Sequence, residues 1–416
     1  MESRRTFLRA TGVAASASLA GCADQVSSFV ESDRVDTGGD PPVTQPDTQF
    51  RGNLRRHGVY PDATVPEAVT VDWRMPEINT GDHTAAKASA VQAPGGDIVV
   101  PGDTAEVRRV TPDGEVVWTA EAGSSSRGVH GTPTIANGAV YIGAYDGAMY
   151  AFDLETGEQY WRTDLGGSIG SSPGYYDGTV YIAVEYPTPS GAMYAVDAIT
   201  GEVEWDDQRV TDHPHSTCAI DRENGYMVVG ANDGDLYCWT YPDYEFQWTF
   251  ETGEPIKGPV AIHDGHGVFG SWDSAVYSVA LADGSESWHF DTGGLVMSGP
   301  SIEPSTGTVY IGSHDTRMYA LEFETGDQRW EFDSDGRFIG CPVVTAGHVL
   351  AGSQDDHLYA LDKDSGEEVW RARADGQVTS TPLVTDDAVY YTARASGDYL
   401  DDGEGPTGAL YRLVPA

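Results

Sequence analysis

The sequence predicts an all-β protein in which one unit of about 42 residues is repeated eight times. Tryptophans recur at intervals of 40 to 45 residues along the chain. They are Trp73, Trp118, Trp161, Trp205, Trp248, Trp288, Trp330 and Trp370. Each interval carries the same series of strand and turn signals, and no segment keeps the 3.6-residue apolar period of a helix.

The unit is clearest before Trp161. Ala139–Gly143 and Met149–Asp153 are short runs of aromatic and aliphatic residues, which is typical of strands. Asp146-Gly147 and Thr156-Gly157 favour hairpin turns, because glycine adopts positive φ without strain. Four strands per unit make the blade of a β-propeller. We therefore predict an eight-bladed propeller of four-stranded blades.

The two ends of the chain are expected to share one blade. The last interval, from Val378 to Ala416, has strand signals but no closing tryptophan. The spare Trp73 lies in Val69–Trp73, before the first complete interval. We expect this N-terminal strand to complete the last blade, which closes the ring and removes two exposed sheet edges.

The N-terminus carries two ordered export motifs. Residues 3–9 read SRRTFLR, which resembles a twin-arginine signal, and Leu19-Ala20-Gly21-Cys22 resembles a lipobox. The resemblance implies a signal peptide at 1–22, a lipid on Cys22 and a location on the outer face of the cell membrane. Residues 23–49 are poor in large apolar residues and predict a flexible acidic tether before a propeller at 50–416.

Acidic residues dominate the charge of the chain. Asp and Glu total 65 against 24 Lys and Arg, a net charge of -41, and the acids recur along the whole sequence. Such a surface repels nucleic acid and anionic lipid headgroups, so we expect neither as a partner. The acid-rich, lysine-poor composition resembles proteins of salt-loving archaea; an ordinary acidic secreted protein is the alternative.

One motif connects the repeat to a known family. The spacing Ala-x-Asp-x-x-x-Gly-x-x-x-Trp occurs complete in Ala151–Trp161, Ala195–Trp205 and Ala360–Trp370. It resembles the tryptophan-docking motif of PQQ-like repeat propellers, which include BamB-like lipoproteins. The resemblance implies indoles that donate to carbonyls of neighbouring blades. It also implies a monomeric, non-catalytic scaffold for other cell-surface or membrane proteins. Blade 4 departs from the motif, with Thr240 and Tyr244 in place of Asp and Gly.

PQQ-dependent dehydrogenases share the repeat, so a quinoprotein oxidoreductase is the alternative function. In members that oxidise alcohols, the resemblance implies adjacent cysteines over the quinone and a bound calcium. Cys218, Cys238 and Cys341 are far apart, and no nucleophile elbow, HExxH or phosphate loop is present. We expect no catalytic residues, no metal site and no cofactor, with PQQ and calcium implied by family resemblance alone.

A binding site is expected at one mouth of the central channel. Loops before the innermost strands meet the turns between second and third strands there, together with the insertions Glu185–Gly191 and Arg394–Gly408. The candidate residues are Lys87, His130, His215, Lys257, Trp272, Met297, Arg337 and Phe338. A mildly basic, aromatic mouth favours an anionic ligand or an acidic peptide, or small ligands generally. The alternative is that these side chains bind only channel water. No carboxylate lies at useful spacing from the histidines, so a metal there is not expected.

Overall fold

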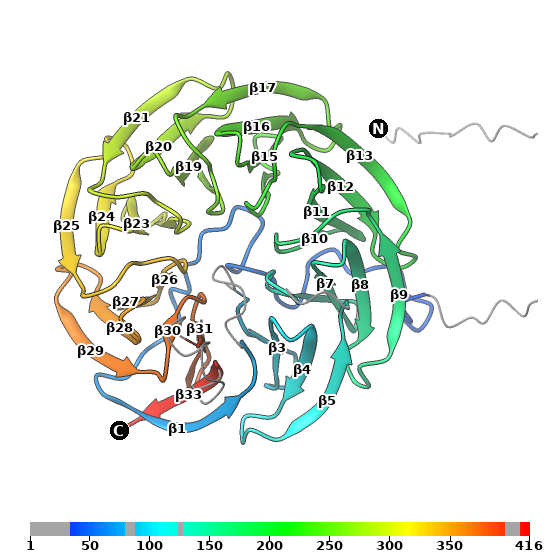
Figure 1. Ribbon diagram of the computed structural model, residues 1–416, viewed down its shortest axis with the longest axis horizontal. Coiled ribbons are helices and arrows are strands. Elements are labelled where there is room, and N and C mark those ends of the chain that lie inside the picture. The colour runs from blue at the N-terminus through cyan, green and yellow to red at the C-terminus, as the bar shows by residue number, and fades with distance from the viewer. Residues whose placement is uncertain (1–33, 80–87, 124–127, 396–407) are drawn as a thin grey trace, which may run out of the picture. The chain divides into compact units, whose positions relative to one another are not determined.

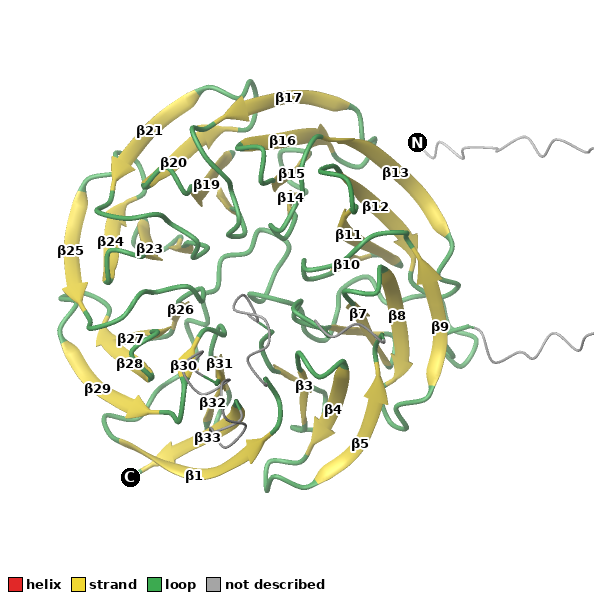
Figure 2. Cartoon of the chain, in the orientation of Figure 1, coloured by secondary structure: helices red, strands yellow, loops and turns green. Residues whose placement is uncertain are grey.

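A computed structural model describes residues 34–79, 88–123, 128–395 and 408–416. These residues form strands and loops, and Asp33–Ala416 make one compact unit in which the sheets are arranged as a ring (Figure 2). Within the described ranges, no helix is long and apolar enough to cross a membrane. The eight sheets confirm the predicted eight-bladed propeller.

Each of the first seven blades contains four antiparallel strands in chain order, from the channel outward. Blade 1 is β2 (Val91–Gln92), β3 (Ile98–Pro101), β4 (Glu106–Val110) and β5 (Val116–Glu121). Blade 2 is β6 (Thr134–Ala136), β7 (Ala139–Gly143), β8 (Ala148–Asp153) and β9 (Gln159–Asp164). Blade 3 is β10 (Gly174–Tyr176), β11 (Thr179–Glu185), β12 (Gly191–Asp197) and β13 (Val203–Val210). Blade 4 is β14 (Ala219–Asp221), β15 (Tyr226–Gly230), β16 (Asp235–Thr240) and β17 (Phe246–Glu251).

The ring continues with the same order of strands (Figure 1). Blade 5 is β18 (Ala261–His263), β19 (His266–Gly270), β20 (Ala275–Ala280) and β21 (Glu286–Asp291). Blade 6 is β22 (Ser301–Glu303), β23 (Thr308–Gly312), β24 (Arg317–Glu322) and β25 (Gln328–Asp333). Blade 7 is β26 (Val343–Val344), β27 (His348–Gly352), β28 (His357–Asp362) and β29 (Glu368–Arg373).

The eighth blade joins the two ends of the chain. Its inner strand is divided into β30 (Gln377–Val378) and β31 (Leu383–Val384), which both pair with β32 (Val389–Arg394). The next strand, β33 (Ala409–Pro415), pairs with β1 (Val69–Pro76) from Val69↔Pro415 to Pro76↔Ala409. In Figure 1 the blue β1 lies along the red β33 at the rim. The predicted closure by an N-terminal strand is confirmed.

Tryptophan docking connects neighbouring blades. In the described part of the chain, seven of the eight repeat tryptophans donate Nε1–H to a main-chain carbonyl of the next blade or its leading segment, at 2.7 to 3.1 Å. Trp205 makes no such bond there; its ring stacks on Tyr244, with ring centroids 4.7 Å apart. Blade 4 therefore packs on blade 3 by a different contact, as its departure from the motif predicts.

The segment before β1 belongs to the folded unit, so the predicted tether at 23–49 extends too far. Val35 is 3% exposed and its N–H bonds to the carbonyl of Ile199. Farther on, residues 47–60 run along the channel-facing edges of the inner strands. Their main chain bonds in turn to Ile135, Ile220, Ile262, Ile302 and Val344, in blades 2 and 4 to 7. This segment closes one end of the channel and leaves the predicted mouth at the other.

Candidate binding site at the channel mouth

The mouth of the channel contains a cavity of about 810 Å³. It is lined by His130, Tyr145, Ser168, Gly170, Glu185, Tyr186, Pro187, His213, His215, Lys257, Trp272, Met297, His314, Arg337, Ile339, Gln354 and Arg394. A narrower space of about 40 Å³ shares His130, His215 and Met297 with it and reaches Phe50 of the N-terminal segment. The site is therefore a pocket that is open at the channel mouth and closed at its inner end by the N-terminal segment.

Six of the eight predicted mouth residues line this cavity: His130, His215, Lys257, Trp272, Met297 and Arg337. Lys87 lies outside the described residues. Most of the second insertion also lies outside them, although Arg394 at its start lines the cavity.

The assignment of Phe338 to the mouth is wrong. Its side chain is 0% exposed and packs in the core between blades 6 and 7, with its ring 6.3 Å from that of Tyr359. Successive side chains of an extended loop point in opposite directions, so Arg337 and Ile339 face the cavity and Phe338 faces away. Phe338 fills the space that Gly312 leaves, where an added Cβ would lie 2.3 Å from the phenylalanine Cβ.

Several cavity residues were missed from the sequence. Tyr145, His314 and Gln354 occupy the position of Trp272 in their own blades, one residue before the aspartate of the turn between second and third strands. That repeat position was a usable signal. Glu185 begins the insertion that the sequence placed at this mouth, although it was not itself a candidate residue. His213 had no such signal, because it lies in an irregular loop that no repeat register places.

Cationic side chains face this cavity in an otherwise acidic protein. Lys257 Nζ lies 4.0 Å from the centroid of the Trp272 ring. Burial lowers the pKa of Lys257, and the nearby Glu185 and Asp212 carboxylates only partly oppose this shift. Among the described residues, neither Lys257 nor the exposed Arg337 makes an ion pair with a carboxylate. Both charges remain available to an anion in the cavity.

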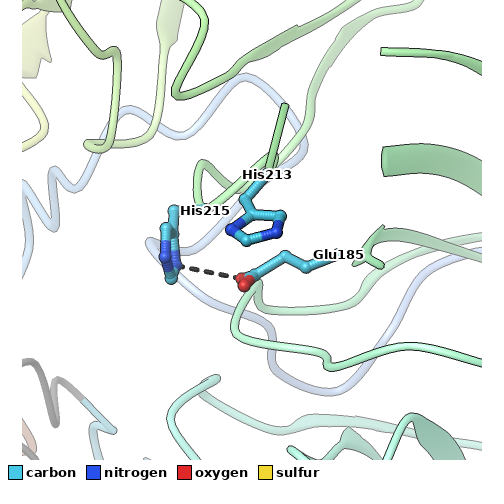
Figure 3. Close-up of side chains that lie close together, drawn as sticks. All are labelled: Glu185, His213 and His215. Carbon is cyan, nitrogen blue, oxygen red and sulfur yellow. Dashed lines mark ion pairs between the residues drawn. The ribbon is translucent and has the colours of Figure 1, made fainter. Parts of the chain in front are cut away.

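Glu185, His213 and His215 come together on one wall of the cavity (Figure 3). His215 Nδ1 lies 2.9 Å from Glu185 Oε1. The Glu185 side chain is 6% exposed, and those of His213 and His215 are 31% and 23% exposed. The local sequence around the histidines shows no carboxylate at useful spacing, because Glu185 belongs to the preceding blade. The fold, not the local sequence, supplies this neighbour.

Comparison with known proteins relates the chain to one family. The family model described as outer membrane protein assembly factor BamB matches residues 103–220, 219–336 and 330–405. The outer membrane protein assembly factor BamB of Alkalilimnicola ehrlichii is 37% identical over 62 residues. That alignment covers 14% of this chain and 16% of the relative, so it compares a small part of each protein.

Solved structures of two functional kinds share the fold. The quinohemoprotein alcohol dehydrogenase from Comamonas testosteroni is 16% identical with a TM-score of 0.71, over 92% of this chain and 83% of its own. BamB from Moraxella catarrhalis is also 16% identical, with a TM-score of 0.63, over 83% of this chain and 100% of its own. Because these likenesses show the fold alone, they do not choose between an enzyme and a protein of another kind. The family matches, which span most of the propeller, show that the chain belongs to the BamB-like family of PQQ-type repeat propellers.

Proposed function

We propose that this protein is a non-catalytic scaffold on the outer face of the cell membrane, and that its channel mouth binds an acidic segment of another membrane or surface protein. The observation that carries the proposal is the cavity of about 810 Å³, which half-buried Lys257 and exposed Arg337 line without ion-pair partners among the described residues. In a chain with a net charge of -41, two such cationic side chains in one cavity favour the binding of an anion there.

The size of the cavity favours a peptide or another extended ligand over a single inorganic ion. Trp272, Tyr145 and Met297 add aromatic and aliphatic surface to the cationic groups. A chain segment with acidic side chains beside an apolar one would use both kinds of contact. BamB relatives are described as outer membrane protein assembly factors, which supports a role beside other membrane proteins.

A lipid on Cys22 and export by the twin-arginine route complete the proposal. Both rest on the two N-terminal motifs, which lie outside the described residues. If the anchor is correct, Cys22→Ser releases the protein from the membrane fraction. If Arg4 and Arg5 direct export, replacing both with Lys keeps the protein inside the cell. A Cys22→Ser protein that stays with the membranes would contradict the anchor.

A quinone enzyme with calcium fits the cavity poorly. Calcium takes about six to eight oxygen ligands, mainly carboxylates and carbonyls. Among the described residues that line the cavity, Glu185 is the one carboxylate, whereas His130, His213, His215 and His314 supply imidazoles. The free cysteines of the described chain are all buried, and none is adjacent to another. The donor set therefore favours a role other than that of a calcium-dependent quinoprotein.

The binding proposal is tested with a synthetic peptide rich in Asp and Glu. We expect it to change the fluorescence of Trp272 on binding, while a peptide of the same length with Asn and Gln does not. Arg337→Ala should weaken the binding about tenfold, as loss of one charged contact does. Equal responses to both peptides, or no effect of Arg337→Ala, would contradict the proposal. The control is Arg371→Ala, which removes a half-exposed arginine of β29 away from the cavity.

Crosslinking in native membranes tests the partner itself. A photoreactive residue at position 337 lies at the cavity, whereas one at exposed Val117 in the outer strand β5 does not. The proposal predicts reproducible adducts with membrane or surface proteins from position 337 alone. A dye-reduction assay with added PQQ, calcium, alcohols and sugars tests the alternative, and robust turnover would replace the scaffold with an oxidoreductase.

A further inference from the structure

We propose that Glu185, His213 and His215 form a binding site for a divalent transition-metal ion, with Zn²⁺ as the expected occupant. One ligand atom of each residue lies within 4.8 Å of the other two. This site goes beyond the binding of an acidic segment, because the ion would be held by the three side chains without any partner.

The main chain fixes all three positions. Glu185 ends β11, and its N–H and carbonyl both bond to Ser168, at 2.8 and 2.6 Å. The loop His213-Pro214-His215 turns tightly, because the N–H of His215 bonds to the carbonyl of His213 at 3.0 Å. The same carbonyl accepts the N–H of Asn232 at 3.0 Å, which holds the loop against blade 4. Both histidines are thus presented to the same wall of the cavity (Figure 3).

A second contact orients the His213 ring. Its Nε2 lies 2.8 Å from the carbonyl oxygen of Tyr186. A carbonyl only accepts, so Nε2 carries the proton and Nδ1 keeps a lone pair for a metal. A histidine that binds metal through one nitrogen and donates the other N–H to a carbonyl is the usual arrangement in metalloproteins.

The distances between the ligand atoms are close to those found around a bound ion. Tetrahedral Zn²⁺ with bonds of about 2.0 Å places its ligand atoms about 3.3 Å apart. His215 Nδ1 and Glu185 Oε1, at 2.9 Å, are already within that range. His213, held by its contact with Tyr186, has the most exposed side chain of the three. Asp212, whose Oδ1 lies 3.8 Å from His213 Nδ1, adds a second carboxylate beside the site.

The ligand chemistry selects the ion. Two imidazoles and one carboxylate suit Zn²⁺ and the later first-row metals rather than Ca²⁺ or Mg²⁺, which prefer oxygen ligands throughout. Lys257 faces the same cavity, and the Glu185 and Asp212 carboxylates act electrostatically on it. Three protein ligands on a cavity wall also leave a coordination position open toward the cavity.

The test is metal titration of the full chain, purified without a polyhistidine tag and stripped with a chelator. Zn²⁺ is followed by calorimetry and Co²⁺ by its visible absorption, which reports ligand geometry. We expect one tight site per chain with tetrahedral or five-coordinate Co²⁺ bands. Glu185→Gln and His213→Ala should each weaken binding about tenfold or more. Binding without defined stoichiometry, or an affinity unchanged by both substitutions, overturns the proposal.

His289→Ala is the matched control. His289 Nδ1 lies 2.8 Å from Glu286 Oε1 on β21, so it is a histidine–glutamate pair without a second histidine. This substitution should leave metal affinity unchanged, and an equal loss would assign the binding to the acidic surface in general. Thermal melting of every variant, compared with the parent, separates loss of metal from loss of fold.

A third variant blocks the site without removing a ligand. A Cβ at Gly170 would lie 3.0 Å from Glu185 Oε1 and 3.4 Å from His215 Nδ1. Gly170→Ala should therefore weaken Zn²⁺ binding while keeping all three ligands. Gly347→Ala, at a position with open space around the added methyl, is its control and should bind Zn²⁺ as the parent does. Full affinity in Gly170→Ala would contradict the location of the site.

Discussion

Trp161 and Trp205 hold the same repeat position in successive blades but contact the next blade differently. Trp161 is 4% exposed and donates Nε1–H to the carbonyl of Ala198 at 3.1 Å. Its ring packs on Gly201, where an added Cβ would lie 2.7 Å from the indole. At the equivalent contact of Trp205, Tyr244 replaces the glycine and stacks on the ring. The Trp161 contact thus depends on a hydrogen bond, whereas the Trp205 contact depends on the area over which its ring stacks on Tyr244.

This difference predicts unequal costs for the same substitution. Trp161→Phe leaves the buried carbonyl of Ala198 without its donor, so we expect the free energy of unfolding to fall by about 1–3 kcal/mol from the hydrogen bond alone. Trp205→Phe keeps a ring for Tyr244 to stack on and should cost less. Denaturant midpoints of both variants measure the difference. A larger loss in Trp205→Phe would contradict this account of docking.

The charge of Lys257 should help the protein to bind an acidic ligand but lower the stability of the fold. Burial lowers its pKa, so the folded protein disfavours the charged ammonium relative to the unfolded chain. Between this lowered folded pKa and the ordinary 10.5, the unfolded state binds more protons, and stability rises with pH. Lys257→Met removes the penalty while keeping an apolar side chain over Trp272.

We therefore expect Lys257→Met to melt at the same temperature as the parent or higher near neutral pH, with the gain disappearing as pH approaches 10.5. The same variant should bind the acidic peptide about tenfold more weakly. Scanning calorimetry at several pH values and peptide titration measure the two effects. A Lys257→Met protein that is clearly less stable at neutral pH would show that the lysine stabilises the fold.

At the scale of elements, β1 is the strand that makes the ring continuous. It pairs with β33, and Trp73 within it docks on the carbonyl of Pro112 in blade 1. Trp370 of blade 7 in turn donates to the carbonyl of Pro66, just before β1. The strand therefore connects three blades, and its loss would expose the edge of β33 to other chains.

Deleting residues 50–78 should make the protein insoluble or lower its melting temperature strongly. The deletion removes β1 and also Phe50–Tyr60, which bonds to inner strands from blade 4 to blade 7. A synthetic peptide of residues 66–78 should restore part of the stability, because it can pair with β33 in trans. Deletion of residues 24–32 is the control. A soluble 50–78 deletion with unchanged melting would refute the closure.

The sequence predicted the elements that repeat and missed those that do not. Tryptophan spacing and Asp-Gly turns recur in each blade, so blade number and closure followed from pattern alone. The segment 34–60 has no strand pattern. It is held by main-chain bonds to the inner strands and by the hydrogen bonds of the buried Arg51 and Arg56 side chains. Glu185 and His213 meet only because blades 3 and 4 are neighbours.

Over the whole molecule, the net charge of -41 sets the response to salt and pH. Carboxylates repel one another across the surface, and salt screens this repulsion over about 10 Å at 0.1 M and about 3 Å at 1 M. Stability should therefore rise with salt. Carboxylates that lack cationic partners are therefore the positions where this repulsion most weakens the fold.

Asp235 is such a point. It begins β16 directly opposite Glu251 of β17, and burial, with Asp233 and Glu251 nearby, raises its pKa to about 6. An acid whose pKa is raised by folding binds its proton more tightly in the folded state, so stability falls as pH rises from about 4 to 6. The loss of stability caused by the ionised Asp235 carboxylate is fully present at pH 7 and absent below pH 4.

Asp235→Asn should accordingly raise the melting temperature at pH 7 and have little effect at pH 4, with a smaller gain in 2 M KCl than in 0.1 M. Asp243→Asn removes an exposed carboxylate from the turn before β17 and controls for net charge. If the melting temperatures of both variants rise equally at pH 7, the effect comes from the net charge of the whole molecule. If Asp235→Asn alone gains, and only above pH 4, the repulsion across β16 and β17 is local, because one unit of net charge is removed in each case.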